Sequence, residues 1–375
     1  MDICEIKQLR LYRQHITDPA DKYTVCHDLN GLQAQFMANV YYALKVRCNT
    51  KEEITQQNFG EGLVKNWTIR GTVHAFHADD LPLFFHDAAR YHSEDFGGYG
   101  IGSEAAYQYV KEKEGYEAQA EEYRKHGFAW TLMPQRQKYF SQFIREKIME
   151  GICTRDELKQ ACMEHGMTQP ESNDMFNPWG GVMSELCERG FLCYRVCEKK
   201  EFMLSPDFVP MNPEDAEKEI ARRYFTHFAP ATVRDFAYYY HCTQTRAKEL
   251  MAKLPLEKAE AAGRDYFYLG ALPGNVPDIP KCVLLAGFDQ LLLGYKKEES
   301  IFLPQEHLRG IFNLAGIVMP PILFDGRVVG RWKKKNKKMS FELFEKVSHK
   351  ERNIIENTAA GLYGEIGKTE WNETA

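Results

Sequence analysis

The sequence contains no apolar run of the roughly 20 residues that a membrane-spanning helix requires. Its longest apolar stretch, residues 282–288, has the length of a single strand. The first ten residues mix charged with apolar side chains, so we expect no secretory signal. Ten scattered cysteines form no C-x-x-C pair, and Cys193 and Cys197 have no histidine near them in the sequence. We therefore expect reduced thiols in a cytoplasmic protein, without a disulfide framework or a zinc site.

Signature motifs of several enzyme classes are also missing. The sequence has no G-x-S-x-G, no H-E-x-x-H and no P-loop, and the glycines of residues 97–102 do not fit the dinucleotide pattern G-x-G-x-x-G. His74 and His77, near Asp79 and Asp80, look like a metal-binding cluster. Two histidines three apart on a strand point to opposite faces, however. We expect no cofactor and no metal ion.

The charge of the chain is unevenly distributed. The net charge is −5, but residues 300–352 hold eleven Lys and Arg against five Asp and Glu. Arg331, Lys333, Lys334 and Lys335 belong to a run, residues 331–338, with six positive charges and no negative charge. Such a basic patch on an acidic protein can bind the phosphates of nucleic acid. The alternative is a solvated, charged turn.

Much of the chain shows groups of helices followed by short strands. At the N-terminus, helices are predicted over residues 3–14, 23–29 and 32–46, and strands over residues 67–76 with a wing-like bend at Arg70-Gly71. Capping boxes at Thr154/Glu157 and Thr232/Asp235 mark helices of a second and a third group. Three helices followed by two strands is the winged-helix pattern.

The C-terminal part changes to strand-like stretches. These are residues 283–295, 301–303, 316–323 and 328–332, with a hairpin turn at Asp325-Gly326 and a closing helix over residues 351–366. They predict a small barrel or an open sheet. We predict an α+β, mainly helical fold with winged helices at residues 1–80, 135–210 and 211–275, a connecting segment at 81–134 and a β-barrel-like domain at 276–375.

Four stretches carry a family resemblance: residues 31–35 (GLQAQ), 67–74 (WTIRGTVH) followed by 79–82 (DDLP), 288–295 (FDQLLLGY) and 325–332 (DGRVVGRW). Together, and in this order, they resemble the bacterial winged-helix DNA-binding family that includes the AlkZ-type DNA glycosylases. The resemblance implies three tandem winged helices and a C-terminal β-barrel around a channel for duplex DNA. It also implies a monomer that acts on the bacterial nucleoid, with a catalytic Gln-apolar-Gln motif that falls on Gln33 and Gln35; a sister branch has Asp at the second position.

The implied function is base excision repair by a monofunctional DNA glycosylase. It would hydrolyse the N-glycosidic bond of alkylated, cationic purines in duplex DNA, including bulky adducts and interstrand crosslinks, which an open channel can admit. Such a base leaves neutral and needs no general acid, so two amides suffice to stabilise the sugar cation and position water. The competing hypotheses are a non-catalytic winged-helix transcriptional regulator and, more weakly, a protein-interaction scaffold.

The predicted helix raises a geometric problem for the glutamine pair. Within residues 32–46, Gln33 shares a face with apolar residues, whereas Gln35 lies about 200° away. Both can reach one sugar only if the helix end enters the DNA or the helix begins later; otherwise Gln35 belongs to an ordinary polar helix face. Trp67, Arg70 and His74 follow the predicted wing and are candidates for DNA contact, although Trp67 fits a core position equally well.

Overall fold

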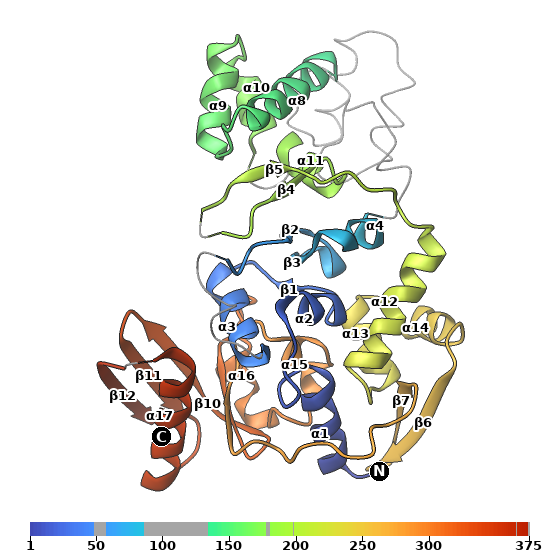
Figure 1. Cartoon of the computed structure of the whole chain (residues 1–375), viewed down its shortest axis with the longest axis vertical. Coiled ribbons are helices and arrows are strands. Elements are labelled where there is room, and N and C mark those ends of the chain that lie inside the picture. Colours follow the sequence, from blue (N-terminus) through green and yellow to red (C-terminus); the bar gives the residue numbers. More distant parts are fainter. Residues whose placement is uncertain (49–57, 86–133, 178–180, 198, 365, 374–375) are drawn as a thin grey trace. The chain divides into compact units, whose positions relative to one another are not determined.

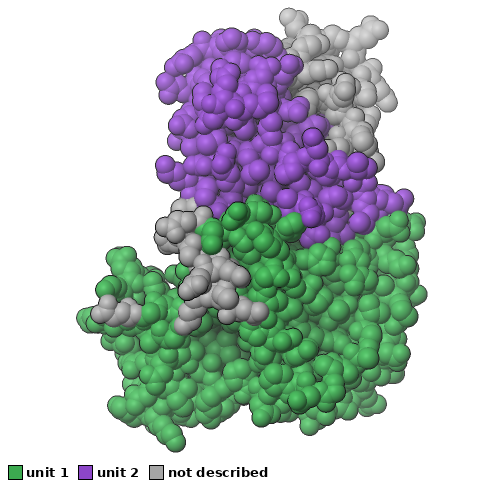
Figure 2. Space-filling model, viewed as in Figure 1, with its two compact units in different colours: residues 1–63, 69–77, 214–375 green, residues 64–68, 78–213 purple. Residues whose placement is uncertain are grey.

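The structure is a computed structural model that describes residues 1–48, 58–85, 134–177, 181–197, 199–364 and 366–373. They form two compact units (Figure 2): unit 1 consists of residues 1–63, 69–77 and 214–375, and unit 2 of residues 64–68 and 78–213. The glycines of residues 97–102 lie outside the described residues. Among the helices that the structure describes, none has the length and apolar character needed to cross a bilayer.

The first part of unit 1 combines capped helices with two short strand pairs (Figure 1). Its elements are α1 (Ile3–Arg13), α2 (Lys22–Asp28), β1 (Leu32–Gln33), α3 (Met37–Arg47), the 3-10 helix η1 (Ile69–Gly71), β3 (Val73–His77), α12 (Pro213–His227), α13 (Val233–Tyr240), α14 (Gln244–Met251), β6 (Leu256–Ala261) and β7 (Arg264–Leu269). Asp2 and Asp21 cap α1 and α2, satisfying backbone N–H groups that a helix start leaves unpaired. The predicted capping box at Thr232/Asp235 is confirmed at the start of α13.

The second part of unit 1 is an open, five-stranded sheet with short helices. Its elements are β8 (Cys282–Leu284), α15 (Gln290–Leu293), η3 (Lys297–Glu299), η4 (Gln305–His307), α16 (Leu308–Ile311), β9 (Pro321–Phe324), β10 (Arg327–Lys335), β11 (Lys338–Leu343), α17 (His349–Tyr363) and β12 (Lys368–Glu373). The strand order is β12-β11-β10-β9-β8, with β11 and β12 parallel. Asp325 and Gly326, with φ of +46° and +68°, form the predicted tight turn between β9 and β10. The described strands therefore leave β8 and β12 as free edges.

Three of the predicted C-terminal strands differ from the structure: the stretch 316–323 becomes a strand only at Pro321, where β9 begins. The stretch 283–295 leaves the strand conformation after Leu284, and residues 301–303 form no strand. The reason at 283–295 is a helix start: the Asp289 side chain accepts a hydrogen bond from the Leu291 N–H at 2.9 Å and thereby begins α15.

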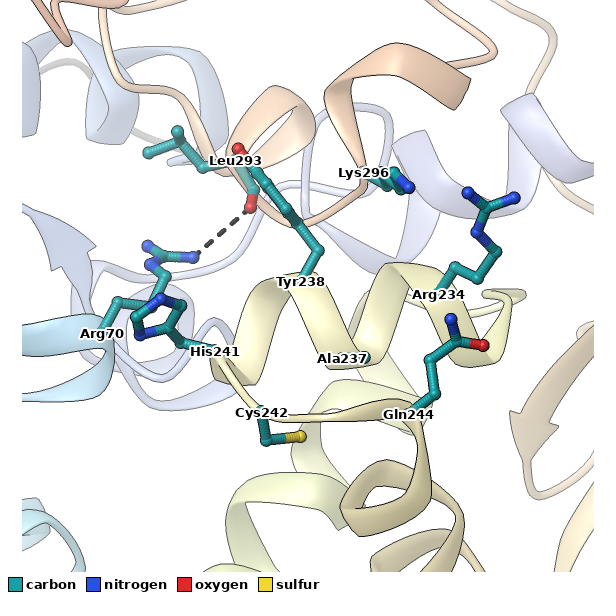
Figure 3. A pocket seen from close by; sticks show the side chains of 9 residues that line it. All are labelled: Arg70, Arg234, Ala237, Tyr238, His241, Cys242, Gln244, Leu293 and Lys296. Atoms are coloured by element: carbon teal, nitrogen blue, oxygen red, sulfur yellow. Dashed lines mark hydrogen bonds between the residues drawn. The ribbon is translucent and has the colours of Figure 1, made fainter.

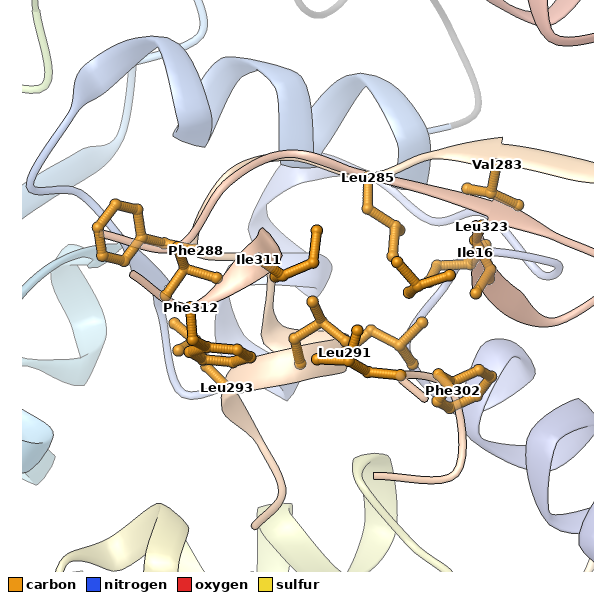
Figure 4. Close-up of a cluster of buried hydrophobic side chains, with 14 of the residues drawn as sticks. Ile16, Val283, Leu285, Phe288, Leu291, Leu293, Phe302, Ile311, Phe312 and Leu323 are labelled. Carbon is orange, nitrogen blue, oxygen red and sulfur yellow. The ribbon is translucent and has the colours of Figure 1, made fainter. Parts of the chain in front are cut away.

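A buried apolar cluster joins the N-terminal and C-terminal parts of unit 1 (Figure 4). Leu11 and Ile16, from α1 and the loop after it, pack there with Leu285, Leu291 and Leu323. Each such side chain contributes roughly 1.5–3 kcal/mol when it is fully buried. The hydrophobic effect therefore holds together segments nearly 300 residues apart in the sequence, and α15 lies among them.

Unit 2 is helical with short antiparallel strands. Its elements are β2 (Leu63–Trp67, of which residues 64–67 belong to this unit), η2 (Ala78–Asp80), α4 (Leu81–Phe84), α8 (Pro134–Met149), α9 (Arg155–Glu164), α10 (Gln169–Met175), α11 (Val182–Glu188), β4 (Leu192–Tyr194) and β5 (Phe202–Leu204). The predicted capping box at Thr154/Glu157 and the predicted hairpin of β4 with β5 are confirmed. Phe140, Leu158 and Leu186 are fully buried in the unit's core.

Candidate active site

The two candidate catalytic residues lie on an extended segment that precedes α3. Gln33 belongs to β1, where it pairs with His74 on β3, and the Ala34 N–H donates to Val73 O at 2.8 Å. α3 begins only at Met37, after an extended Phe36 with φ −123° and ψ 113°. The helix predicted over residues 32–46 is therefore wrong up to Phe36. Phe36 offers no capping side chain, so the sequence gives no signal for the later start.

The extended backbone changes the relation between the two glutamines. Gln33 lies in β1 and Gln35 lies beyond its end, so neither is bound to the helical register that would have separated them widely. Gln33 is 8% exposed, while Gln35, which lies in a bend after the strand, is exposed. Gln33 is thus held at the margin of the protein interior, and Gln35 reaches solvent.

Gly31 and Gln290 fix the beginning of this segment. Gly31 has φ +85°, and a Cβ there would lie 3.1 Å from Ala75 O and 3.2 Å from the His74 Cβ. The Gln290 side chain, from α15, donates its Nε2–H to Gly31 O at 3.0 Å. Residues 31–35 and 288–295, two of the stretches that carry the family resemblance, therefore meet within unit 1.

A buried ion pair ties α3 to the same part of the chain. Arg47, at the end of α3, donates from Nη2 to Asp289 Oδ1 at 2.7 Å and from Nη1 to Oδ2 at 2.9 Å. Both side chains are fully buried. A bidentate pair of this kind fixes orientation as well as distance. The helix that follows the glutamines and the strand that carries Gln33 are thus anchored by adjacent residues, Asp289 and Gln290.

Arg70 and His74 form a largely buried pair beside β1. His74 is 2% exposed, its Nδ1–H donates to Thr72 O at 3.1 Å, and its Nε2 accepts from Arg70 Nη2 at 3.4 Å. Burial, with a smaller contribution from the Arg70 charge, lowers the pKa of His74 to about 3, so this imidazole is neutral at neutral pH. DNA contact by the two residues stays a prediction, since His74 presents little surface to a ligand.

Arg70 also lines a pocket of about 500 Å³ in unit 1 (Figure 3). Its Nη1 donates to Leu293 O at 3.4 Å, and its guanidinium lies 5.3 Å from the centre of the Tyr239 ring. The other lining residues are Arg234, Ala237, Tyr238, His241, Cys242, Gln244, Leu293 and Lys296. Arg234 and Lys296 pair with Glu299, whereas no ion pair within the described residues involves Arg70. Arg70 is the lining cation that no described carboxylate neutralises.

The basic run predicted to bind phosphates forms the end of the β10–β11 hairpin. Lys333 and Lys335 are exposed there. Lys334 is partly buried, with its Nζ 5.9 Å from the centre of the Tyr363 ring. Arg331 donates to both carboxylate oxygens of Glu342 at 2.8 Å and to Gly310 O at 2.9 Å. Arg331 is therefore already engaged within the protein, as is Lys338, which pairs with Glu370 at 2.6 Å.

Trp67 belongs to unit 2, as do the two free cysteines Cys193 and Cys197. Trp67 ends β2 and is 36% exposed, so it is neither a full core residue nor a fully solvated one. The Cys193 thiol is buried and lies 3.0 Å from Ser205 Oγ, while the Cys197 thiol donates to Lys199 O. Burial raises the pKa of both thiols, which disfavours the thiolate that zinc requires.

The supporting residues of the site were not identified from the sequence. Asp289 and Gln290 stand in a stretch whose pattern predicts a strand, and their partners Arg47 and Gly31 lie more than 240 residues away. The one usable signal was the family-like stretch 288–295, which contains two polar residues among apolar ones.

Comparisons with known proteins identify the family of this chain. A sequence profile of the family described as "DNA glycosylase AlkZ-like" matches residues 27–364. An "Interstrand DNA cross-link repair glycosylase" of Streptomyces sahachiroi is 24% identical over 326 residues, which cover 81% of this chain and 80% of the relative. The solved structure of the Streptomyces sahachiroi DNA glycosylase AlkZ matches with a TM-score of 0.70 and 20% identity, covering 100% of this chain and 99% of that one. That likeness shows a shared fold.

Proposed function

This chain belongs to the AlkZ-like DNA glycosylase family, and we propose that Gln33 and Gln35 are the residues with which it hydrolyses the N-glycosidic bond of alkylated purines. Membership in a family of enzymes decides against the non-catalytic regulator as its function. The observation that carries the assignment is the late start of α3 at Met37, because it frees both glutamines from the helical register that would have turned them apart.

The chemistry of the pair defines the substrate class. Alkylation at N7 or N3 gives a purine a positive charge, so the base leaves as a neutral molecule when the glycosidic bond breaks. The enzyme must then stabilise positive charge on the sugar and direct a water molecule to C1′. Amide carbonyl dipoles can do both. An amide cannot take up a proton as a carboxylate does, so undamaged purines and uracil are poor substrates.

Interstrand crosslinks are part of the proposed substrate range. The Streptomyces sahachiroi relative bears the name of a crosslink repair glycosylase, and the likeness to it covers most of both chains. A crosslink attached through N7 of a purine carries the same cationic activation as a methyl adduct. The proposed enzyme would thus release one strand by the same bond cleavage.

The finer architecture is also a proposal. Three winged helices, at residues 1–80, 135–210 and 211–275, and a C-terminal domain at 276–375, in which the predicted β-barrel is replaced by the open five-stranded sheet, would bind duplex DNA. The order of helices before paired strands in residues 134–204 and 213–269 supports this division. We propose that Lys333 and Lys335 bind phosphates, with Lys334, Arg331, Trp67, Arg70 and His74 as further candidates. The protein would act as a monomer in the bacterial cytoplasm, on nucleoid DNA.

The test is a single-turnover assay with a duplex that contains one N7-methylguanine. The wild-type protein should release the free base. Gln33→Ala and Gln35→Ala should each reduce the rate by about 10²–10³-fold, the usual cost of removing one transition-state hydrogen bond, while DNA affinity is retained. Gln305→Ala, at an exposed glutamine elsewhere in unit 1, is the matched control and should keep the wild-type rate.

The outcomes separate the parts of the proposal. If both alanine variants keep at least a tenth of the wild-type rate, the glutamine assignment fails while the family's activity stands. If the wild-type protein releases no base from methylated or N7-crosslinked duplex, the substrate class is wrong. An amide cannot form a Schiff base, so a monofunctional enzyme should leave no protein–DNA adduct after borohydride treatment.

A further inference from the structure

A carboxylate in unit 1 is surrounded by three histidines. Asp28 Oδ2 lies 2.9 Å from His15 Nε2 and 3.4 Å from His227 Nδ1, and Asp28 Oδ1 lies 2.9 Å from His27 Nδ1. The potential ligand atoms of His15, Asp28 and His227 all lie within 4.8 Å of one another. The glycosidic chemistry proposed above uses none of these residues.

We propose that His15, Asp28 and His227 form a binding site for a divalent transition-metal ion of the Zn²⁺ class. Two imidazole nitrogens and one carboxylate oxygen are a ligand set that such ions accept. Zn²⁺ held at about 2.1 Å from each ligand in a tetrahedral arrangement needs ligand atoms roughly 3.4 Å apart. The 3.4 Å between His227 Nδ1 and Asp28 Oδ2 meets that requirement, and the 2.9 Å between His15 Nε2 and the same oxygen would lengthen on binding.

The backbone around the cluster favours a cation. Asp28 and His227 are the last residues of α2 and α12, and His15 follows the C-cap of α1. The carbonyl end of a helix carries partial negative charge, which attracts positive ions. Arg222, a cation whose charge acts on Asp28, is paired with both oxygens of Glu219 at 2.5 Å and 2.7 Å. It therefore does not occupy the Asp28 carboxylate.

The surrounding hydrogen bonds orient the proposed ligands. The His15 Nδ1–H donates to Asp18 O at 3.2 Å, and its Nε2–H donates to Asp28 Oδ2 at 2.9 Å. His227 Nδ1–H donates to Arg13 O at 3.3 Å, so a bound ion would replace the protons on His15 Nε2 and His227 Nδ1. A ring N–H bonded to a backbone carbonyl is the common outer partner of a metal-binding histidine. His27 contacts the other oxygen of Asp28 and so fixes the carboxylate plane. The side chains of the three ligands are 13–19% exposed, which leaves an approach for the ion and a fourth position for water.

The chemistry of the ligand set agrees with this geometry. Metal ions bind the carboxylate and the neutral imidazole. The ion would clip together the C-terminal ends of α1, α2 and α12, next to the turn that leads into β1.

The experiment measures metal binding by the full-length chain, prepared without an affinity tag and freed of metal with a chelator. Titration with Zn²⁺, followed by elemental analysis, should give one equivalent per chain and raise Tm by about 5 °C at hundredfold excess over Kd. Co²⁺ should give visible absorption bands of a four-coordinate site. The double variant His15→Gln/His227→Gln and the single variant Asp28→Asn should lose the equivalent, the bands and the Tm increase while keeping the far-ultraviolet circular dichroism of the wild type.

Two control variants make the result specific. His349→Gln removes an exposed histidine at the start of α17 and should leave the equivalent unchanged. His27→Gln should still bind one equivalent of Zn²⁺, with about ten- to hundredfold weaker affinity, as expected for a residue that orients a ligand. If the wild-type chain binds no Zn²⁺, or if the double variant binds as much as the wild type, the site does not exist. Glycosylase activity enters none of these readouts, so they stand independently of the proposed catalytic residues.

Discussion

At the scale of single residues, the glutamine pair depends on groups that would not touch the substrate. Gly31 supplies a backbone conformation with φ +85°, Gln290 holds the Gly31 carbonyl, and Asp289 neutralises Arg47 in the protein interior. A buried charge left without its partner costs several kcal/mol, so Arg47 requires Asp289. Buried contacts thus hold the proposed catalytic segment on its protein-facing side. Its exposed end, at Gln35, stays accessible to a ligand.

His74 makes the stability of the protein sensitive to acid. Its pKa is about 3 in the folded protein and about 6.5 in an unfolded chain, so between these values the unfolded chain binds a proton that the folded one does not. The free energy of unfolding should therefore fall as the pH decreases from about 6.5, by up to about 1.4 kcal/mol per pH unit. His227, with a pKa of about 4, adds to this slope. Urea denaturation at pH 7, 6 and 5 measures it.

The variant His74→Gln isolates the contribution of this residue. A glutamine does not titrate, so the variant should show a slope smaller by about 1.4 kcal/mol per pH unit below pH 6. His349→Gln, at an exposed position, is the control and should follow the wild type. Parallel pH dependence of the wild type and His74→Gln would show that His74 is protonated as easily in the folded state as in the unfolded one.

At the scale of elements, the β10–β11 hairpin is the clearest candidate for contact with the DNA backbone. Two of its exposed lysines, Lys333 and Lys335, should each release about one counterion from duplex DNA. The double variant Lys333→Gln/Lys335→Gln should therefore weaken binding to all sequences alike. The slope of log K against log salt should decrease in magnitude by about 2. Fluorescence anisotropy with undamaged duplex at 50–200 mM salt gives this slope.

The matched control for the hairpin is Lys258→Gln. Lys258 is an exposed lysine of the same unit, on β6, and pairs with Asp265. It should leave the salt dependence unchanged. An unaltered slope in the double variant would assign the hairpin to the solvated surface instead.

Sequence signals that act within a few residues predict helix starts and turns correctly. Strand pairing between distant residues is not predicted by them. The capping boxes at Thr154 and Thr232 and the turn at Asp325-Gly326 lie within a few residues of what they determine, and all three are confirmed. β1 exists only because it pairs with β3, about 40 residues later, and the apolar spacing of residues 32–46 fits a helix just as well. The glutamines themselves were found through the family resemblance. The contacts of Asp289 and Gln290 that hold the glutamine segment are visible only in the tertiary structure.

At the scale of the whole molecule, the two units have separate apolar cores. Leu186 is fully buried in the core of unit 2, with Phe140 and Leu158. Leu186→Ala should destabilise that unit by about 2–5 kcal/mol, because the substitution leaves a cavity. Hydrogen exchange should then accelerate in α8–α11, while the amides of α15 and β10 in unit 1 keep their protection.

The control for this prediction is Leu314→Ala, which removes an 89% exposed leucine of unit 1 and should change neither unit. Equal loss of protection in both units after Leu186→Ala would show that they unfold as one cooperative body. In that case the division into units describes packing without describing stability.

The two anchors of the glutamine strand, Asp289 and Gln290, have a consequence for biosynthesis. Gln290 is 259 positions after Gly31, and Asp289 is 242 positions after Arg47. At roughly 5–20 residues per second, a ribosome needs about 10 to 50 s to deliver these anchors after the glutamines have emerged. During that interval the nascent chain carries the proposed catalytic pair without the residues that anchor its segment. A product that ends before residue 289 would therefore lack both anchors and should show no glycosylase activity.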